Sequence, residues 1–239
     1  MEWLKQKLRN RSEVLEDPIK YRSLVGGLLY LAVMTRPDIA ACTAILGRKF
    51  SEAREADWTA AKLVLRFLSG TKDYYLQLGG TPEEALLGHS DADWAGDPDS
   101  RRSTTGFVFS FGGGILSWAS RRQSSVKLSS MEAEYVALSE ASQETLWLRQ
   151  LLSDFGETQK QPTVLREDNQ GCLAFFQKER TSRRSKHTNT RERIVHELCA
   201  KKEIVLEYCS TDQMLADIFT KPLGPQKHDM FREMLGLKE

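Results

Sequence analysis

The sequence lacks the features expected of a membrane protein or a disulfide-bonded protein. Its longest nearly unbroken apolar run, Leu24 to Met34, has eleven residues, well short of the roughly 20 that a membrane-spanning helix needs. Its four cysteines are scattered, and no two of them have CxxC spacing. We therefore expect no membrane partner, and reduced thiols in a cytosolic or nuclear setting, such as the cytoplasm or a virus-like particle within it.

An excess of charge of one sign is also lacking. The 34 lysines and arginines nearly balance the 33 aspartates and glutamates, for a net charge of +1, so total charge does not indicate a nucleic-acid partner. The local distribution is less even, because positions 178 to 193 hold seven basic residues and only two acidic ones. This stretch suits a surface that follows a phosphate backbone, with a solvated polar loop as the alternative.

The first eighty residues have the pattern of a small helical segment. Asp17-Pro18 is typical of a capped helix start and opens an apolar helix through Met34. Arg36-Pro37-Asp38 ends it and begins a second helix to about Phe50, and a third spans 56–68. The segment 24–34 is apolar enough to need burial, so we predict self-association of the isolated chain if its partner is absent.

The pattern changes near Tyr74, where short β-type runs separated by glycines begin. A long helix is expected at about 130–155, and strands and helices alternate after it. The expected strands are 74–78, 85–90, 104–111, 115–119, 163–167 and 204–208, and the later helices are 170–177, 190–201 and two closing ones. Antiparallel strands followed by alternating elements predict an α/β mixed sheet with helices on its faces. The expected domains are 1–80, 81–223 and a C-terminal helix or tail over 224–239.

Three acidic residues are placed at or after the ends of predicted strands. Asp91 ends the strand that begins the mixed sheet, and Asp168 follows the strand 163–167 directly, where α/β sheets hold their ligands. A helix N-cap is the alternative role for Asp168. Asp217 follows the last strand among apolar residues, and a plain surface acid is its alternative.

A fourth acid, Glu134, lies on the face of the long helix that must pack on the sheet. Every third or fourth position falls on this face: Glu134, Leu138, Ala141, Thr145, Leu148, Leu152 and Phe155. Glu132 points about 160° away and is expected to be a solvated acid in the first turn. Burying an unpaired carboxylate is costly, and the stripe has no lysine or arginine, so a cation held jointly with other acids is the expected partner of Glu134.

If the four acids converge, they form an oxygen-rich site suited to Mg²⁺. Two such ions about 4 Å apart can activate a water and stabilise the leaving oxygen of a phosphodiester.

Several strings resemble the ribonuclease H domain of copia-type retrotransposon polyproteins. They are His89-Ser-Asp-Ala-Asp-Trp-Ala-Gly96, Arg102-Ser-Thr-Thr-Gly-Phe107, Ser129-Ser-Met-Glu-Ala-Glu-Tyr135, Glu167-Asp-Asn-Gln170, Lys186-His187 and Ala216-Asp-Ile-Phe-Thr-Lys-Pro-Leu223. Upstream, Tyr21-Arg-Ser-Leu-Val-Gly-Gly-Leu-Leu-Tyr30, Arg36-Pro-Asp38 and the helix from Trp58 to Gly70 are similar to the end of the reverse transcriptase of the same polyproteins. The resemblance covers nearly the whole chain, in order.

The resemblance implies a ribonuclease H-like mixed five-stranded sheet flanked by helices and preceded by a reverse transcriptase C-terminal segment. It implies an endonuclease that hydrolyses the RNA strand of RNA–DNA hybrids with two Mg²⁺ ions, for which Mn²⁺ could substitute. Its metal-binding and catalytic quartet would be Asp91, Glu134, Asp168 and Asp217, with Asp91 bridging the ions and Asp93 as the alternative to Asp91. The implied partners are the hybrid and the polymerase domain of the reverse transcriptase.

Further side chains are candidates for substrate contact. Ser103, Thr104 and Thr105 would reach a nucleic-acid backbone, and Asn169 and Gln170 would contact sugar hydroxyls, the groups that distinguish RNA from DNA. The alternative for these five is turn and strand-edge chemistry. The candidates in the basic stretch are Arg183, Arg184, Lys186 and His187. Trp94 and Trp118 are candidates for base stacking, although core burial is the expected use of both.

Two other functions compete with this interpretation. One is a catalytically silent ribonuclease H-fold module that binds nucleic acid or a polymerase partner. The other is a transposase or integrase, which the Asp-Asn-Gln string and the acid after the last strand argue against. The chain lacks a Tyr-x-Asp-Asp motif, which excludes polymerase activity for it. It also has no histidine between Ile204 and Asp217, where cellular ribonucleases H carry one.

Overall fold

The computed structural model describes residues 12–80, 85–177 and 190–239. The candidate contacts Arg183, Arg184, Lys186 and His187 lie outside the described residues. The chain divides into two compact units, one of Met1–Gln77 with Lys221–Glu239 and one of Leu78–Thr220. Each unit is described by itself.

The first unit is mainly helical, as the sequence predicts. Its helices are α2 (Pro18–Met34), η1 (Pro37–Ile39), α3 (Ala40–Gly47), α4 (Glu55–Gly70) and α9 (Pro225–Met234). The predicted start of α2 is confirmed, because the Asp17 side chain accepts hydrogen bonds from the backbone N–H of Ile19 and Lys20. This satisfies donors that a helix start otherwise leaves open.

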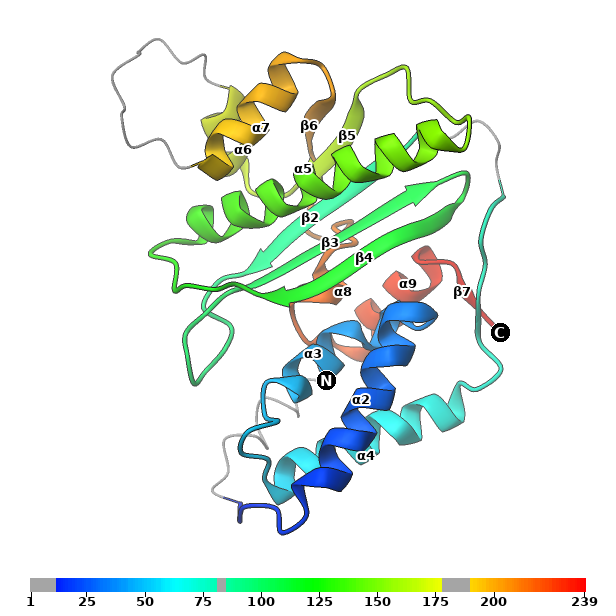
Figure 1. Ribbon diagram of the computed structural model, residues 1–239, viewed down its shortest axis with the longest axis vertical. Coiled ribbons are helices and arrows are strands. Elements are labelled where there is room, and N and C mark those ends of the chain that lie inside the picture. The colour runs from blue at the N-terminus through cyan, green and yellow to red at the C-terminus, as the bar shows by residue number, and fades with distance from the viewer. Residues whose placement is uncertain (1–11, 81–84, 178–189) are drawn as a thin grey trace. The chain divides into compact units, whose positions relative to one another are not determined.

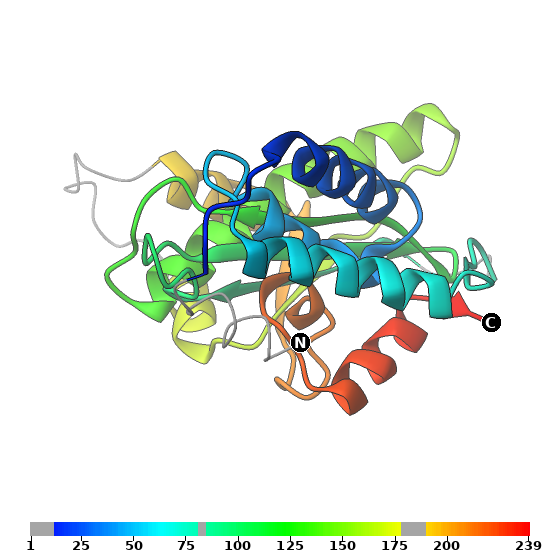
Figure 2. The same ribbon diagram turned by 90° about the horizontal axis from the view of Figure 1, so that it is seen from below.

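The C-terminal residues belong to this helical unit, which differs from the expected separate tail. Strand β1 (Tyr75–Leu76) pairs antiparallel with β7 (Leu237–Lys238), and Figure 2 shows α9 leading into β7 at the C-terminal end. The run 74–78, expected as a strand of the β region, therefore contributes only two paired residues to a separate two-stranded sheet. A local β pattern does not reveal that its partner is at the far end of the chain.

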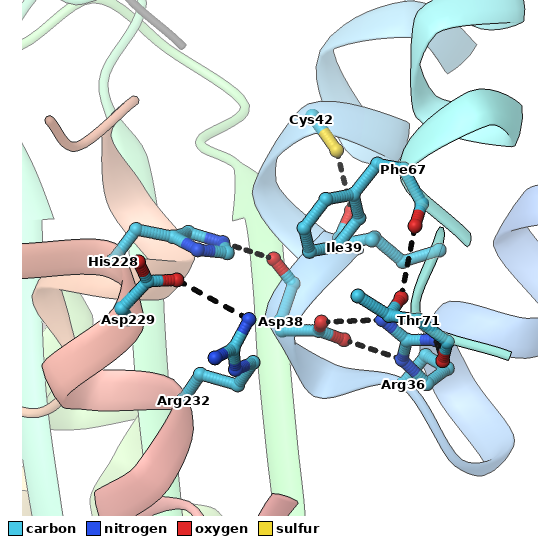
Figure 3. A network of polar contacts seen from close by, with 9 residues as sticks. All are labelled: Arg36, Asp38, Ile39, Cys42, Phe67, Thr71, His228, Asp229 and Arg232. Atoms are coloured by element: carbon cyan, nitrogen blue, oxygen red, sulfur yellow. Dashed lines mark hydrogen bonds and ion pairs between the residues drawn. The ribbon is translucent and has the colours of Figure 1, made fainter. Parts of the chain in front are cut away.

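A polar network also joins α9 to the N-terminal helices (Figure 3). The Arg36 guanidinium donates to both carboxylate oxygens of Asp38, at 2.9 and 2.7 Å, and to Oγ1 of Thr71 at 2.8 Å. Ring atom Nε2 of His228, in α9, lies 3.0 Å from the backbone oxygen of Asp38. The buried arginine is thus fully engaged by fixed acceptors, and the segment predicted as a helix break forms the joint between these elements.

Helix α2 is apolar on both sides. Tyr21, Val25 and Leu28 are buried, whereas Tyr30 and Val33 are largely exposed. No helix among the described residues has both the length and the apolar content needed to cross a bilayer.

The second unit contains the predicted mixed five-stranded sheet (Figure 1). Its strands are β2 (Leu87–Asp93), β3 (Thr104–Phe111), β4 (Gly114–Arg122), β5 (Thr163–Glu167) and β6 (Ile204–Tyr208), in the order β4-β3-β2-β5-β6. The pairs β2–β5 and β5–β6 are parallel, and the other two are antiparallel. The ribonuclease H-like fold class is confirmed.

Helices cover both faces of the sheet. The long α5 (Ser130–Asp154) packs on one face, where Phe107, Phe109 and Leu165 meet Leu138 and Leu148 of the helix. The helices α6 (Gln170–Gln177) and α7 (Thr190–Ala200) complete this layer. The predicted stripe of α5 is confirmed through Leu152, whereas Phe155, just after the helix, is 77% exposed.

The short α8 (Asp217–Thr220) lies on the opposite face, against β3. Gly106 of β3 makes this approach feasible, because a Cβ there would lie 2.5 Å from Cγ2 of Thr220 and 3.0 Å from the backbone oxygen of Ala216. The absence of a side chain at one strand position therefore positions α8, which carries Asp217, beside the centre of the sheet.

Candidate metal centre

The site forms where two parallel strands stop pairing. The register of β2 and β5 runs from Leu87↔Val164 to His89↔Arg166, yet β2 continues to Asp93 and β5 to Glu167. Beyond the last pair the carboxyl ends of the two strands are no longer joined by hydrogen bonds. In α/β sheets this is the place where ligands bind.

Three of the four predicted acids meet at this place. One carboxylate oxygen each from Asp91, Glu134 and Asp168 lies within 4.8 Å of the others. Asp91 comes from β2, Glu134 from α5 and Asp168 from the residue after β5. Their oxygens are close to the separation of roughly 3–4 Å expected for ligands that share an Mg²⁺ ion at about 2.1 Å each.

The electrostatics of Glu134 favour a bound cation. Burial raises the pKa of its carboxyl well above the ordinary value, and the charges of Glu167, Asp91 and Asp168 raise it further. Its Oε2 atom is buried and has no hydrogen-bond partner within the described parts of the chain. A hard divalent ion would supply both the missing partner and the opposite charge. The donor set, oxygen ligands only, fits Mg²⁺ or Mn²⁺.

Threonine hydroxyls orient two of the acids. Thr220 of α8 donates its hydroxyl hydrogen to Oδ2 of Asp91. Thr211 donates to Oδ2 of Asp168 at 2.7 Å. Each carboxylate is thus held by a side chain from the segment that follows β6.

Asp217, the fourth predicted acid, is fully buried at the start of α8. It is not a member of the group of three with oxygens within 4.8 Å. It does act on the same region: burial raises the pKa of the Cys209 thiol, and the charges of Asp168 and Asp217 both add to that shift. The charges of Asp217 and Asp168 thus both reach Cys209, in the segment after β6.

The structure distinguishes the predicted acids from their neighbours. Asp93 does not join the group, and its Oδ2 atom lies 1.6 Å from where a Cβ on Gly96 would be, so its carboxylate folds over the following turn. Glu132 is in the first turn of α5, as predicted, and its Oε2 accepts from the backbone N–H of Leu128 at 2.9 Å. Ser129 accepts from the Glu132 backbone in return, so Glu132 is part of the helix cap.

The predicted hydroxyl contacts point into the unit. Ser103, Thr104 and Thr105 are at most 3% exposed. Ser103 accepts from the Ala95 backbone N–H at 3.1 Å, and Thr105 accepts from Nε2 of Gln123 at 3.1 Å. This differs from the expectation that they reach a nucleic-acid backbone, because hydroxyls beside a turn and a strand end satisfy nearby donors.

The other predicted contacts lie nearer the surface. Asn169, rather than Asp168, caps α6, since its Oδ1 accepts from the Cys172 backbone at 2.9 Å. Gln170 is exposed. Trp94 is 48% exposed and donates from Nε1 to the Lys127 backbone oxygen, so its expected core burial is wrong. Trp118 is half-buried.

Sequence reasoning did not single out one buried acid beside the site, Glu167, which directly precedes Asp168 and is not one of the three acids with oxygens within 4.8 Å. This last residue of β5 is fully buried, and its Oε1 accepts from the Asn169 backbone at 3.1 Å. The signal was available, because strand alternation puts Glu167 on the same face as Thr163 and Leu165, which are also buried. The sequence prediction includes Glu167 only as a strand residue and as the first residue of the Glu167-Asp-Asn-Gln170 string.

The fold and the acids define the class: a ribonuclease H-like α/β unit with a candidate divalent-metal site. No protein-family model matches the chain. Over 92% of its length, the chain is 36% identical to the retrovirus-related Pol polyprotein from transposon TNT 1-94 of Nicotiana tabacum. Over 93% of its length, it is 35% identical to the retrovirus-related Pol polyprotein from transposon RE2 of Arabidopsis thaliana. The chain is thus a homologue of part of the retrovirus-related Pol polyproteins of copia-type transposons.

The chain spans only 16% and 15% of the lengths of these two polyproteins. A shorter relative, the secreted RxLR effector protein 161 of Plasmopara viticola, is 49% identical over 54% of this chain and 92% of its own length. Among solved structures, LC11-RNase H1, isolated from compost, aligns with 57% of this chain and 92% of its own, with a TM-score of 0.41 and 17% identity.

Proposed function

We propose that the unit Leu78–Thr220 is an endonuclease that hydrolyses the RNA strand of RNA–DNA hybrids with two bound divalent ions, Mg²⁺ or Mn²⁺, within the replication machinery of a retrotransposon. One observation carries the proposal. Three acids from separate elements bring their oxygens within 4.8 Å of one another, and one of them, Glu134, has a buried oxygen without a hydrogen-bond partner among the described residues. Similarity to the Pol polyproteins supports the proposal.

Asp91, Glu134, Asp168 and Asp217 would hold the metal. When bound, two such ions lower the pKa of a water and stabilise the leaving oxygen of a phosphodiester. The chain's own contribution is to orient the carboxylates in advance. Thr220 fixes one oxygen of Asp91 and Thr211 fixes one of Asp168, and the packing of α5 on the sheet holds Glu134 within 4.8 Å of both.

Substrate recognition would fall to groups near the surface of the site. Gln170 is exposed at the start of α6, and Asn169 keeps its amide nitrogen for a ligand while its oxygen caps the helix. Contacts of this kind with the 2′-hydroxyl would select RNA. The basic stretch around Lys186 and the polymerase domain are also proposed to hold the hybrid. Binding of the hybrid through the basic stretch would weaken as the salt concentration rises.

A catalytically silent module is the second candidate, and one observation favours it: Asp217 is not in the group of three acids. A silent module would bind hybrid and leave it intact. The two candidates make opposite predictions for the same assay.

The test is cleavage of a hybrid with a labelled RNA strand by the full chain. We expect cleavage in Mg²⁺, none in EDTA, and none of duplex DNA. Asp91→Asn is expected to lose at least about 100-fold in rate while still binding hybrid. Glu157→Gln, which changes an exposed acid outside the site, is the matched control and should cleave like the parent. Equal cleavage by all three proteins, or none by any, would reject the proposal.

A further inference from the structure

We propose that Glu167 is a fifth acidic residue of the metal centre, which lies behind Glu134 and Asp168 and increases the affinity of the site for divalent cations. The inference rests on the proposed function in one respect, that the neighbouring acids bind metal.

The fold directs Glu167 toward the site. Leu165, two residues earlier, faces the core beneath α5 and is fully buried. Strand alternation places Glu167 on that same face. It is one residue beyond the last β2–β5 pair, His89↔Arg166, and therefore at the point where the strands stop pairing. Glu134 reaches the same place from α5.

The hydrogen bonds of Glu167 leave one oxygen for another partner. Oε1 accepts from the Asn169 backbone at 3.1 Å, which also braces the backbone on both sides of Asp168. Oε2 is buried and has no hydrogen-bond partner in the part of the chain that the structure describes. A fully buried carboxylate with an unused oxygen is costly unless a cation compensates it.

Electrostatics place Glu167 in the same environment as the other acids. Burial raises the pKa of Glu167 well above its ordinary value, and the charges of Asp91 and Asp168 add to that rise. After burial, the charge of Glu167 has the largest effect on the pKa of Glu134, larger than that of Asp91. Glu167 is not one of the three acids with oxygens within 4.8 Å, so it would act on a cation that Glu134 binds through its charge rather than as a ligand.

A purely structural role is the competing explanation, since Glu167 also accepts the Asn169 N–H. Glu167→Gln separates the two roles, because glutamine retains the accepting Oε1 and the shape of the side chain but removes the charge. Glu167→Asp is the complementary change, since it retains the charge and shortens the side chain.

The experiment measures Mn²⁺ affinity of the full chain by calorimetry, with the metal alone as probe. We expect Glu167→Gln to weaken the affinity about tenfold, in line with the loss of one charge near a divalent ion, and Glu167→Asp to weaken it less. Glu157→Gln is the control and should match the parent. Metal-free Glu167→Gln should unfold at the same temperature as the parent or higher, because a buried ionisable carboxyl is replaced by a neutral amide of the same shape.

Three results would overturn the inference: equal Mn²⁺ affinity of Glu167→Gln and the parent, a greater loss in Glu167→Asp than in Glu167→Gln, or a metal-free Glu167→Gln that does not fold. Failure of the proposed function gives a different result, because a silent module would bind Mn²⁺ with this dependence on Glu167 and still not cut a hybrid.

Discussion

Thr220 and Asp91 are 129 positions apart in the sequence, and the Thr220 hydroxyl donates to Oδ2 of Asp91 in the interior of the second unit. The contact exists because Gly106, the cross-strand neighbour of Asp91, has no side chain to keep α8 away from the sheet. The element that carries Asp217 therefore also fixes the orientation of Asp91. This hydrogen bond links the segment that carries Asp217 to the orientation of Asp91.

Removing the Thr220 hydroxyl should disturb Asp91. Thr220→Val keeps the shape but leaves a buried carboxylate oxygen without this donor, which should cost about 1–3 kcal/mol of folding free energy. Urea unfolding of the metal-free chain measures it. Thr220→Ser retains the donor and should lose less; a larger loss for serine than for valine would show that methyl packing, and not the hydrogen bond, matters.

Gly106→Ala should displace α8. The added Cβ would lie 2.5 Å from the Thr220 side chain and 3.0 Å from a backbone oxygen, and overpacking of this kind costs about 1–3 kcal/mol. Gly26→Ala is the control, because nothing lies within 4 Å of its Cβ and alanine favours a helix. Equal stability of the two variants would contradict this account of α8.

Divalent cations should stabilise the folded chain. A ligand that binds only the native state at about 100 times its Kd adds roughly 2.7 kcal/mol, so Mg²⁺ should raise the melting temperature and EDTA should reverse the rise. Asp91→Asn should show little of this shift. A melting temperature that is independent of Mg²⁺ in the parent chain would argue against a metal site.

Cys42 should be unreactive in the folded chain. Burial raises the pKa of its thiol to about 12, with a contribution from the nearby charge of Asp38. Only about one thiol in 10,000 would then be the reactive thiolate at pH 8. Alkylation followed by mass spectrometry should modify Cys42 slowly in buffer and rapidly in urea; equal rates would mean that the helical unit opens readily.

Patterns of local periodicity predicted most of the fold correctly, together with the positions of three of the acids, Asp91, Glu134 and Asp168. The 3.6-residue stripe of α5 placed Glu134 on the buried face and Glu132 away from it in the first turn, because helix geometry fixes which residues share a face. Strand ends located Asp91 and Asp168 in the same way. The acceptance of the Leu128 N–H by Glu132 was not predicted. Strand β2 extends past its predicted end at Ser90, because β3 continues to pair with it as far as Asp93↔Thr104.

Contacts between distant segments could not be predicted. The pairing of β1 with β7 and the hydrogen bonds of Ser103 and Thr105 depend on which donors the fold brings near, and no local pattern encodes that. Glu167 was not predicted as a site residue for another reason: it was considered only as a strand residue and as part of the Glu167-Asp-Asn-Gln170 string, although strand alternation places its side chain on the buried face.

The most direct test compares two glutamates two positions apart on one helix. We predict that Glu134→Gln cuts a labelled RNA–DNA hybrid in Mg²⁺ at least about 100-fold more slowly than the parent, whereas Glu132→Gln, which keeps an acceptor oxygen for the helix cap, cuts at the parental rate. Equal rates for the two variants would contradict the claim that carboxylates gathered between β2, β5 and α5 carry the chemistry.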